Sequence, residues 1–276
     1  MQRIIISSYK DKRIVYNHTL YKNPDNDVFD FHTHDICEII FLKQGDISGK
    51  IGGKTYKLKK NNLIIFRPMV AHGIFIDSNR DYERYNILFD EKIIANKAFE
   101  KLPADLDIIN FEGNNYVLDI FKKLDYYYNN FDGQNLKRLI SNLIEELVFN
   151  LTLAPYNKLN TQLISTNPLI NRAIEYIQNN YTNQITVEQI CKELFISKSH
   201  LHHLFIDNIN MSPKKYINLQ RLAKAQNLIR TGIKPYEAYL LCGFTDYATF
   251  YRNYKNHFGH TPSSELGSEI IREIKS

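Results

Sequence analysis

The feature that most constrains the fold is a pattern that occurs twice within residues 167–262. Each copy has a short helical stretch, a tight turn, and a second helical stretch with basic and aromatic side chains. The first copy covers residues 185–205 and turns near Phe195, and the second covers residues 235–255 and turns at Gly243. Two copies of a helix-turn-helix motif predict an all-α domain in this part of the chain.

Residues suited to begin helices stand where this pattern needs them. Thr186 and Gln189 fit a capping box, and Ser197 is placed to cap the second helix of the first copy. Asn-Pro at 167–168 and Ser-Pro at 212–213 each supply an N-cap followed by proline in the first turn. The helix that follows Ser212 lies between the two copies, so we expect it to fix their separation.

Two helix-turn-helix units can place two recognition helices in successive major grooves on one face of DNA. The buried faces of these helices are predicted to carry Leu201, Leu204, Phe205, Phe250 and Tyr254. The exposed faces are predicted to contact DNA through Lys198, Ser199, His202, His203, Tyr247, Thr249, Tyr251, Arg252 and Lys255. Arg252 is the best candidate for bidentate recognition of guanine.

The distribution of charge supports this prediction modestly. The chain of 276 residues has a net charge of +5. Residues 168–276 hold 13 Lys and Arg against 9 Asp and Glu, and the remaining residues hold 22 against 21. The basic excess therefore lies with the repeat, as phosphate contact requires.

The first 90 residues have the short β-branched and aromatic stretches that are typical of strands. Gly52 and Gly53 predict a two-residue hairpin turn. The regular spacing of the stretches predicts a small barrel or sandwich. The expected strands cover residues 4–6, 38–42, 47–51, 54–58 and 63–66.

Helical periodicity follows in residues 114–128 and is stronger in residues 134–153. The apolar stripe of the second helix either packs on its own β domain or forms a dimer seam between subunits. Residues 154–167 lack periodicity and are predicted to be a linker. We therefore expect an α+β chain with a sensing and dimerisation domain (residues 1–153), a linker (154–167) and a DNA-binding domain (168–276).

The repeat resembles the DNA-binding domain of the AraC/XylS family of bacterial transcription regulators. The resemblance covers about 95 residues and implies a seven-helix domain with two DNA-binding units. Asn210 stands where glycine is usual, and the large Tyr239 replaces a small residue. The matching residues include Ile190, Ser197, Leu201, Phe205, Arg221, Lys224, Ala225, Leu228, Gly243, Phe244, Asp246, Phe250, Arg252, Tyr254, Phe258, Gly259 and Pro262.

The N-terminal part looks like a cupin, because a His-x-His pair at 32 and 34 precedes Glu38 and Gly45, and His72 follows Pro68. In metal-binding cupins such residues converge on a transition metal. In sensor cupins attached to this type of DNA-binding domain they commonly line a pocket without a metal. We expect no metal or other cofactor, and a small-molecule site lined by His32, His34, Glu38, Arg67, His72 and Tyr85.

The leading hypothesis is a homodimeric, cytoplasmic transcription factor, without enzyme activity, that responds to a sugar or a related metabolite. Its expected partners are promoter DNA, the effector, RNA polymerase and a second copy joined through the helix at 134–153. Activation is the working expectation, and repression stays open. The alternatives are a metal-dependent cupin enzyme with an accessory DNA-binding domain and a constitutive DNA-binding protein. The sequence has no apolar run long enough to cross a membrane, and its three cysteines form no CxxC pair.

Overall fold

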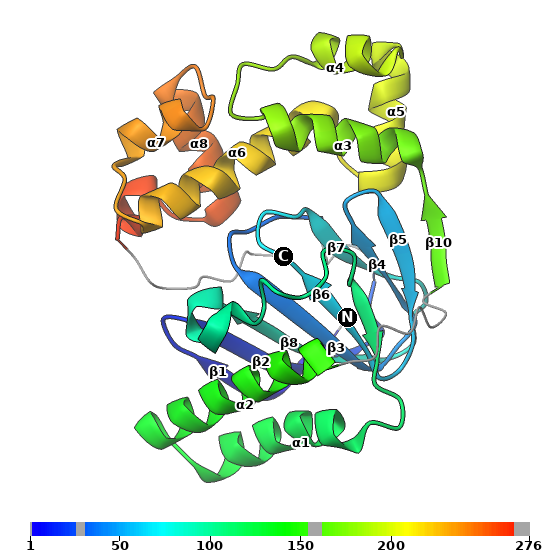
Figure 1. Cartoon of the computed structure of the whole chain (residues 1–276), viewed down its shortest axis with the longest axis vertical. Coiled ribbons are helices and arrows are strands. Elements are labelled where there is room, and N and C mark those ends of the chain that lie inside the picture. The colour runs from blue at the N-terminus through cyan, green and yellow to red at the C-terminus, as the bar shows by residue number, and fades with distance from the viewer. Residues whose placement is uncertain (1, 26–30, 154–161, 268–276) are drawn as a thin grey trace.

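The computed structural model describes residues 2–25, 31–153 and 162–267. They form a β domain, which comprises strands β1 to β10 with helices α1 and α2, and a helical domain, which comprises helices α3 to α8. Figure 1 shows the helical domain on one side of the β domain and helices α1 and α2 on the opposite side.

The strands form two antiparallel sheets, so the predicted barrel is an open two-sheet structure. Its apolar interior contains Ile40, Ile64 and Ile74 from facing strands. The large sheet has the order β1 (Gln2–Lys10), β2 (Ile14–Lys22), β8 (Tyr82–Phe89), β3 (Cys37–Gln44), β6 (Asn62–Phe66) and β9 (Ile108–Asn110). The small sheet has the order β10 (Gln162–Thr166), β5 (Lys54–Leu58), β4 (Ile47–Ile51) and β7 (His72–Ile76).

The predicted strands and the predicted hairpin are confirmed. Ile51 pairs with Lys54, so the turn between β4 and β5 consists of Gly52 and Gly53. A Cβ atom on Gly53 would lie 2.1 Å from Oδ1 of Asn171 in helix α3 (Pro168–Asn180). Glycine at this position therefore allows α3 to approach the tip of the hairpin closely.

Helices α1 (Asn115–Asn130) and α2 (Gly133–Leu153) cover the outer face of the large sheet. The apolar stripe of α2 is buried in the core of its own domain, for example at Leu147 and Leu151. The stripe therefore packs on its own β domain, and its use as a dimer seam was the wrong alternative. The sequence pattern of an apolar stripe is the same whether the helix packs on its own domain or on another subunit.

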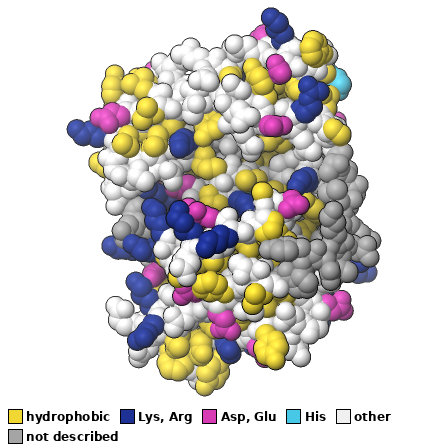
Figure 2. All heavy atoms as spheres, viewed as in Figure 1, with side chains coloured by type: hydrophobic (Ala, Val, Ile, Leu, Met, Phe, Trp, Pro, Cys, Tyr) yellow, Lys and Arg dark blue, Asp and Glu magenta, His cyan; other side chains and the backbone are white. Residues whose placement is uncertain are grey.

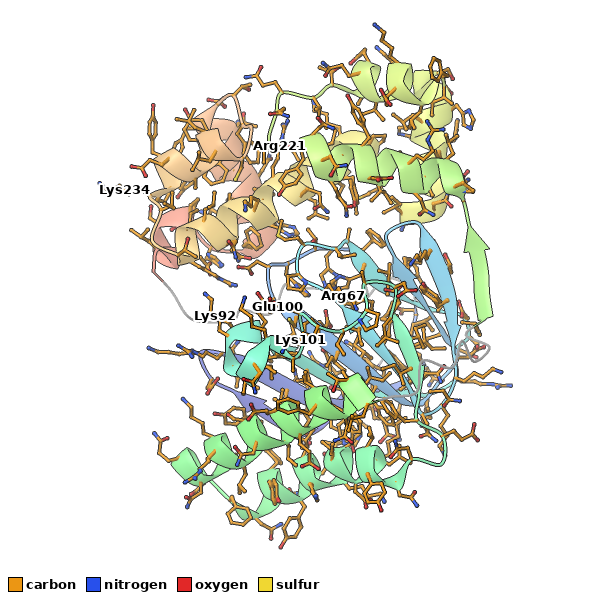
Figure 3. The ribbon with its side chains drawn as sticks, in the orientation of Figure 1. Arg67, Lys92, Glu100, Lys101, Arg221 and Lys234 are labelled. Carbon is orange, nitrogen blue, oxygen red and sulfur yellow. The ribbon has the colours of Figure 1, made fainter. Side chains whose placement is uncertain are left out.

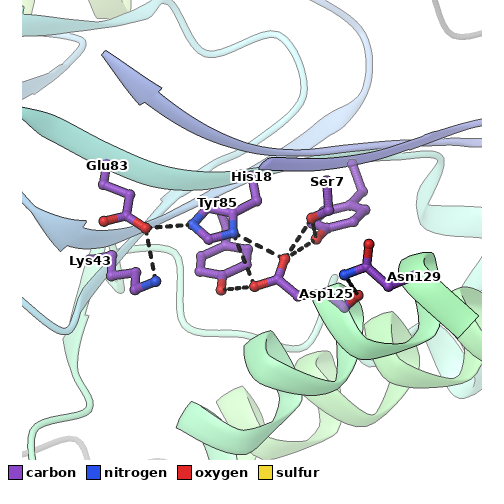
Figure 4. A network of polar contacts seen from close by, with 8 residues as sticks. Ser7, His18, Lys43, Glu83, Tyr85, Asp125 and Asn129 are labelled. Atoms are coloured by element: carbon purple, nitrogen blue, oxygen red, sulfur yellow. Dashed lines mark hydrogen bonds and ion pairs between the residues drawn. The ribbon is translucent and has the colours of Figure 1, made fainter. Parts of the chain in front are cut away.

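A polar network joins α1 to the large sheet (Figure 4). The Asp125 carboxylate on α1 accepts hydrogen bonds from the hydroxyls of Ser7, Tyr16 and Tyr85. The ring of His18 lies between two carboxylates, 3.0 Å from Asp125 and 2.8 Å from Glu83. Burial raises the pKa of the Asp125 carboxyl, but the hydrogen bonds from His18, Ser7 and Tyr85 outweigh it and lower that pKa to about 2.

The helices of the helical domain begin at the predicted caps Asn167, Thr186, Ser197 and Ser212. Among its described residues this domain has six α-helices and a short 3-10 helix, η4 (Pro262–Glu265). Residues 268–276 lie outside the described residues, so the expected number of seven helices stays a prediction. No described helix is long and apolar enough to cross a bilayer. After α3 the helices are α4 (Val187–Leu194), α5 (Lys198–Ile209), α6 (Pro213–Arg230), α7 (Pro235–Leu241) and α8 (Tyr247–Phe258).

The segment predicted as a linker is only partly described. Residues 154–161 lie outside the described residues, and Gln162–Thr166 form strand β10 on the edge of the small sheet. Asn167 then caps α3, with Pro168 in its first turn, as predicted. The domain boundaries themselves remain predictions.

We expect the Asp125→Asn variant to lower the free energy of unfolding at pH 7 by about 1–3 kcal/mol, because an amide replaces a charged acceptor. Asp125 has a lower pKa in the folded state than in the unfolded state. Its contribution is therefore present above pH ~4 and is lost as the pH falls towards 2. Urea unfolding between pH 2 and 7 measures both effects.

Asp119→Asn is the matched control, because Asp119 is exposed on the same helix and pairs across one turn with the exposed Lys122. Equal losses in the two variants, or an unchanged acid limb in Asp125→Asn, would show that the network does not stabilise the domain.

Candidate functional site

The two helix-turn-helix units consist of α4 with α5 and of α7 with α8. The predicted capping box of α4 is present, with Thr186 and Gln189 exchanging hydrogen bonds, and Ser197 caps α5. Asp246 caps α8 by accepting from the backbone N–H groups of Ala248 and Thr249. Asn210 ends α5 in the left-handed conformation. The caps fix where each recognition helix begins, and hence which side chains its first turn presents.

The predicted core of the recognition helices is confirmed, since Leu201, Leu204, Phe205, Phe250 and Tyr254 are all buried. Seven predicted DNA contacts are exposed on α5 and α8: Lys198, Ser199, His202, His203, Thr249, Arg252 and Lys255. Two further predicted contacts, Tyr247 and Tyr251, are only half-buried rather than exposed.

Tyr247 departs from the prediction because the second unit has an aromatic core. Its ring lies 5.3 Å from the ring of Tyr239 and 5.8 Å from that of Phe250. Tyr239, where a small residue was expected, is itself buried. The bulk of Tyr239 thus engages Tyr247 in packing, and less of the Tyr247 ring is free to reach DNA.

Two exposed cations of the recognition helices have weakly held partners within the protein. Lys198 forms an ion pair with Glu188 on α4, and both side chains are more than half exposed. A guanidinium nitrogen of Arg252 lies 3.4 Å from the hydroxyl of Thr249 one turn earlier. Exposed pairs of this kind contribute little stability, so a phosphate or a base can replace the partner at low cost.

Arg221, which is labelled in Figure 3, and Gly243 hold the second unit against the first. The Arg221 side chain donates to the carbonyls of Tyr181 and Asn183 at 2.7 and 2.8 Å, and its guanidinium lies 5.9 Å from the centre of the Phe244 ring. Gly243 has φ +79°, and a Cβ atom there would lie 2.6 Å from the carbonyl oxygen of Thr182. These contacts, together with α6, set the distance between the two recognition helices.

Four of the predicted ligand residues converge at one end of the β domain. The ligand atoms of His32, His34, Glu38 and His72 all lie within 4.8 Å of one another. The backbones of His32 and His72 pair through two hydrogen bonds of 2.8 Å, which places their side chains together. Three of the four residues are buried, and His32 is half-buried.

The hydrogen bonds of this cluster leave a site for a cation or shared protons. Nδ1 of His34 lies 2.9 Å from the Ile36 carbonyl, and Nδ1 of His72 lies 2.8 Å from the Val70 carbonyl. A carbonyl only accepts, so each Nδ1 carries a proton and each neutral ring has its lone pair on Nε2. Both Nε2 atoms face one oxygen of Glu38, at 2.9 and 3.0 Å. The two Nε2 lone pairs and the Glu38 oxygen are thus three acceptors in one buried space. Such an arrangement requires protons or a cation between the acceptors.

Electrostatics favour the ionised carboxylate in this cluster. Burial raises the pKa of Glu38, but hydrogen bonds with His34 and His72, made when their Nε2 atoms carry protons, outweigh it and hold that pKa well below its usual range. Burial lowers the pKa of His72. Three imidazoles and a carboxylate, with two rings oriented by backbone carbonyls, are a donor set that suits a first-row transition metal. The same groups can hydrogen-bond the hydroxyls of a small polar molecule.

Two predicted ligand residues lie elsewhere. Tyr85 donates to Asp125 on the outer face of the large sheet. Tyr85 belongs to the hydrophobic cluster on the outer face of the large sheet. Successive residues of a strand face opposite sides, and the β3 residues that share a face with Glu38 belong to the interior cluster. Tyr85 and Glu38 therefore lie on opposite faces of the sheet. Arg67 donates to the carbonyls of Pro103 and Leu106 and lines a cavity of about 230 Å³ between the β domain and α3.

The sequence interpretation overlooked Arg84, the neighbour of Tyr85 on β8. Its guanidinium lies 5.5 and 5.7 Å from the ring centres of Tyr82 and Tyr21, and both tyrosines belong to the interior cluster. Side chains alternate between the two faces of a strand, so when Tyr85 points to the outer face of the sheet, Arg84 points into the interior of the β domain. This alternation along β8 could have identified Arg84 from the sequence.

Family models match both parts of the chain. An AraC-like ligand binding domain matches residues 18–99, and a helix-turn-helix domain matches residues 190–266. The first match includes the His/Glu cluster, and the second includes both recognition helices.

The chain is similar to curated regulators. It is 25% identical to the lactose operon transcription activator of Staphylococcus xylosus over 219 residues, which cover 79% of this chain and 78% of that protein. It is 31% identical to the raffinose operon transcriptional regulatory protein RafR of Pediococcus pentosaceus over 127 residues, or 45% and 46% of the two chains. The crystal structure of an apo ToxT variant from Vibrio cholerae aligns with 94% of this chain and 98% of that chain, at 15% identity and a TM-score of 0.43.

Proposed function

Because this chain belongs to the AraC/XylS family of DNA-binding transcription regulators, we propose that it controls a sugar-utilisation operon in response to a sugar or related metabolite. The effector binds in the β domain at the cluster of His32, His34, Glu38 and His72. The regulator acts in the cytoplasm, where its DNA is found, and contact with RNA polymerase remains a prediction. Arg67 and Tyr85 take no part in this effector site.

The proposal is supported by the combination, in one chain, of a ligand domain and two exposed recognition helices that are held at a fixed distance from each other. Arg221 and Gly243 tie the two units together without using the exposed faces of α5 and α8. A rigid pair of recognition helices pays little ordering entropy when both enter successive grooves. This arrangement supports sequence-specific binding rather than general attraction to phosphate.

The sugar class is supported by the relatives and by the chemistry of the cluster. The names of two relatives refer to the lactose and raffinose operons. Neutral sugars are recognised through many hydrogen bonds to hydroxyls, which act as both donors and acceptors. The buried imidazoles and the Glu38 carboxylate are groups of that kind.

We expect Arg252→Ala to weaken binding to a duplex selected from a random pool by about 1–3 kcal/mol, or roughly 5- to 150-fold. Because Arg252 is expected to contact base edges, the variant should also lose discrimination at one base position. Gel shifts at several salt concentrations measure the affinity for the selected duplex and for its single-base variants.

Lys255→Ala is the matched control, because Lys255 lies one turn further along the same exposed helix. It should weaken binding to all sequences alike and reduce the salt slope by about one. Wild-type binding that ignores sequence and follows salt alone would contradict the proposed function.

We also propose that the chain forms a homodimer through the outer surfaces of α1 and α2. The stripe of α2 is buried, but Phe149 and Leu153 on the same helix are exposed. Figure 2 shows hydrophobic side chains gathered at this end of the molecule. The exposed apolar residues of α1 and its C-cap are Tyr116, Tyr126, Tyr128 and Phe131.

Phe149→Glu should shift the chain towards monomer in sedimentation equilibrium, because it places a charge in the apolar contact. Asn79→Glu, on an exposed turn of the β domain, adds the same charge and should leave the dimer intact. A monomeric wild-type chain, or a dimer unaffected by Phe149→Glu, would exclude this interface.

A second candidate function is favoured by the convergence of His32, His34, Glu38 and His72, namely a metal-dependent cupin activity in the same domain. A transition metal bound there would polarise an oxygen of a ligand or lower the pKa of a water. The protein residues would hold the ion, and the carbonyls of Ile36 and Val70 would keep two rings oriented.

Metal analysis of the purified chain separates the two candidates. This second function predicts one transition-metal ion per chain, lost together with its thermal stabilisation when His32 and His34 are both changed to Ala. The control is the double change of His202 and His203 to Ala, since these residues are exposed on α5. A chain without stoichiometric metal would exclude the enzyme.

A further inference from the structure

Strand β8 presents polar side chains to the apolar interior of the β domain. Tyr82 belongs to the interior cluster, whereas Tyr85 and Ile87 belong to the cluster on the outer face of the large sheet. Because successive side chains of a strand face opposite sides, Arg84 and Asn86 face the interior together with Tyr82. A charged or polar side chain in such a place is stable only with polar partners.

Two stacked tyrosine rings hold the guanidinium of Arg84. Its Cζ atom lies 5.5 Å from the ring centre of Tyr82 and 5.7 Å from that of Tyr21, and the two rings are inclined by 20°. Nη1 also donates to the Tyr82 hydroxyl at 3.3 Å. A guanidinium stacked on rings presents its N–H groups in its own plane, the direction from which a carboxylate or a phosphate binds two of them. Arg84 is half-buried, so part of its side chain is accessible to another molecule.

The Glu38 carboxylate and the Arg84 guanidinium lie on the same face of the large sheet. Arg84 pairs in register with Leu42 of β3, and Glu38 comes four residues earlier on that strand. Burial lowers the pKa of the Arg84 guanidinium, but the neighbouring Tyr82, Tyr21 and Glu38 groups outweigh it and raise that pKa. The interior thus holds an acidic group and a permanent cation at two levels, so a molecule that contacts both needs different chemistry at its two ends.

Asn86 lies between these two levels and has an unused acceptor. It pairs in register with Ile40 of β3, two residues from Glu38. Its Oδ1 atom is buried and has no hydrogen-bond partner within the part of the chain that the structure describes. A buried acceptor without a donor is costly, so such groups are normally satisfied by a bound molecule or a water. A hydroxyl group of a bound molecule supplies the missing donor.

We propose that the effector is an acidic sugar, whose carboxylate or phosphate is bound by Arg84 while its hydroxyl groups bind Asn86 and the His/Glu cluster. This inference rests on the proposed function for the site and for the sugar class, and it adds the anionic group. A neutral sugar offers the guanidinium no charge-assisted hydrogen bond. Arg84 is therefore the residue that determines the choice between an acidic sugar and its neutral parent.

Matched pairs of sugars test the anionic group on the full-length chain. The pairs are galactose with galacturonate, glucose with glucuronate, and glucose with glucose 6-phosphate, compared at equal concentration by thermal unfolding and calorimetry. At least one acidic member should raise the melting temperature and bind more tightly than its neutral parent. The pair that shows the difference identifies the anion as a carboxylate or a phosphate.

Acetate and inorganic phosphate are the controls for general attraction of anions, and they should not raise the melting temperature at the same concentration. Three results would each overturn the inference: no acidic sugar binds, every neutral parent binds as tightly as its acid, or acetate and phosphate stabilise the chain as strongly as the acidic sugars do.

Variants of Arg84 test its role in the choice of effector. Arg84→Gln should weaken binding of the acidic sugar by roughly 10- to 100-fold and keep the affinity for the neutral parent, because the hydroxyl contacts remain. Arg84→Lys keeps the interior charge but not the planar fork, so it should give an intermediate loss and guards against a folding defect. An unchanged ratio of the two affinities in both variants would overturn the role of Arg84.

Two further variants make the result specific. Asn86→Leu removes an acceptor for a hydroxyl and should weaken the acidic sugar and its neutral parent alike. Arg80→Gln, on the exposed turn before β8, removes the same charge as Arg84→Gln and should leave both affinities unchanged. An equal loss in Arg80→Gln and Arg84→Gln would show that net charge, and not Arg84, attracts the anion.

The inference and the proposed function fail in different ways. A chain that prefers neutral sugars and still selects a DNA sequence from a random pool would contradict only the anionic group. A chain that selects no DNA sequence would contradict the proposed function, while the paired affinities would still decide the role of Arg84.

Discussion

The buried carboxylate of Glu38 is the group on which the sensing part of this regulator depends. It brings His34 and His72 to about 3 Å from one oxygen atom, and both rings are oriented by backbone carbonyls. A charge in this position is stable only while protons or a cation lie between the acceptors. The cluster is therefore poised to respond to an occupant, and the strand-to-loop segment that carries His32, His34 and Glu38 also contacts helix α6 through the ion pair of Asp35 with Arg230.

A second constraint acts inside the helical domain. Arg221 bonds to two carbonyls of the α3–α4 connection, and Gly243 allows the carbonyl of Thr182 to approach the turn of the second unit. The two recognition helices therefore behave as one body. That body contacts the β domain through the buried pair of Asp35 and Arg230.

The sequence predicted the parts of the structure that local chemistry determines. Caps such as Ser197, the Gly52–Gly53 hairpin and the buried faces of α5 and α8 follow from short patterns. The stripe of α2 was ambiguous, because periodicity does not identify the surface that a helix covers. Tyr85 and Arg67 were assigned to the effector site by residue type alone, yet strand alternation turns Tyr85 towards α1. Asp35 and Arg230 are 195 positions apart in the sequence, and no local sequence pattern predicts a contact between such distant residues.

If the two recognition helices act as one rigid unit on DNA, hydroxyl-radical footprinting of the full-length chain on a duplex selected from a random pool will show it. Each bound helical domain should protect two adjacent segments on one face of the duplex, about one helical turn apart. Protection of a single segment per domain, or uniform protection along the duplex, would contradict it.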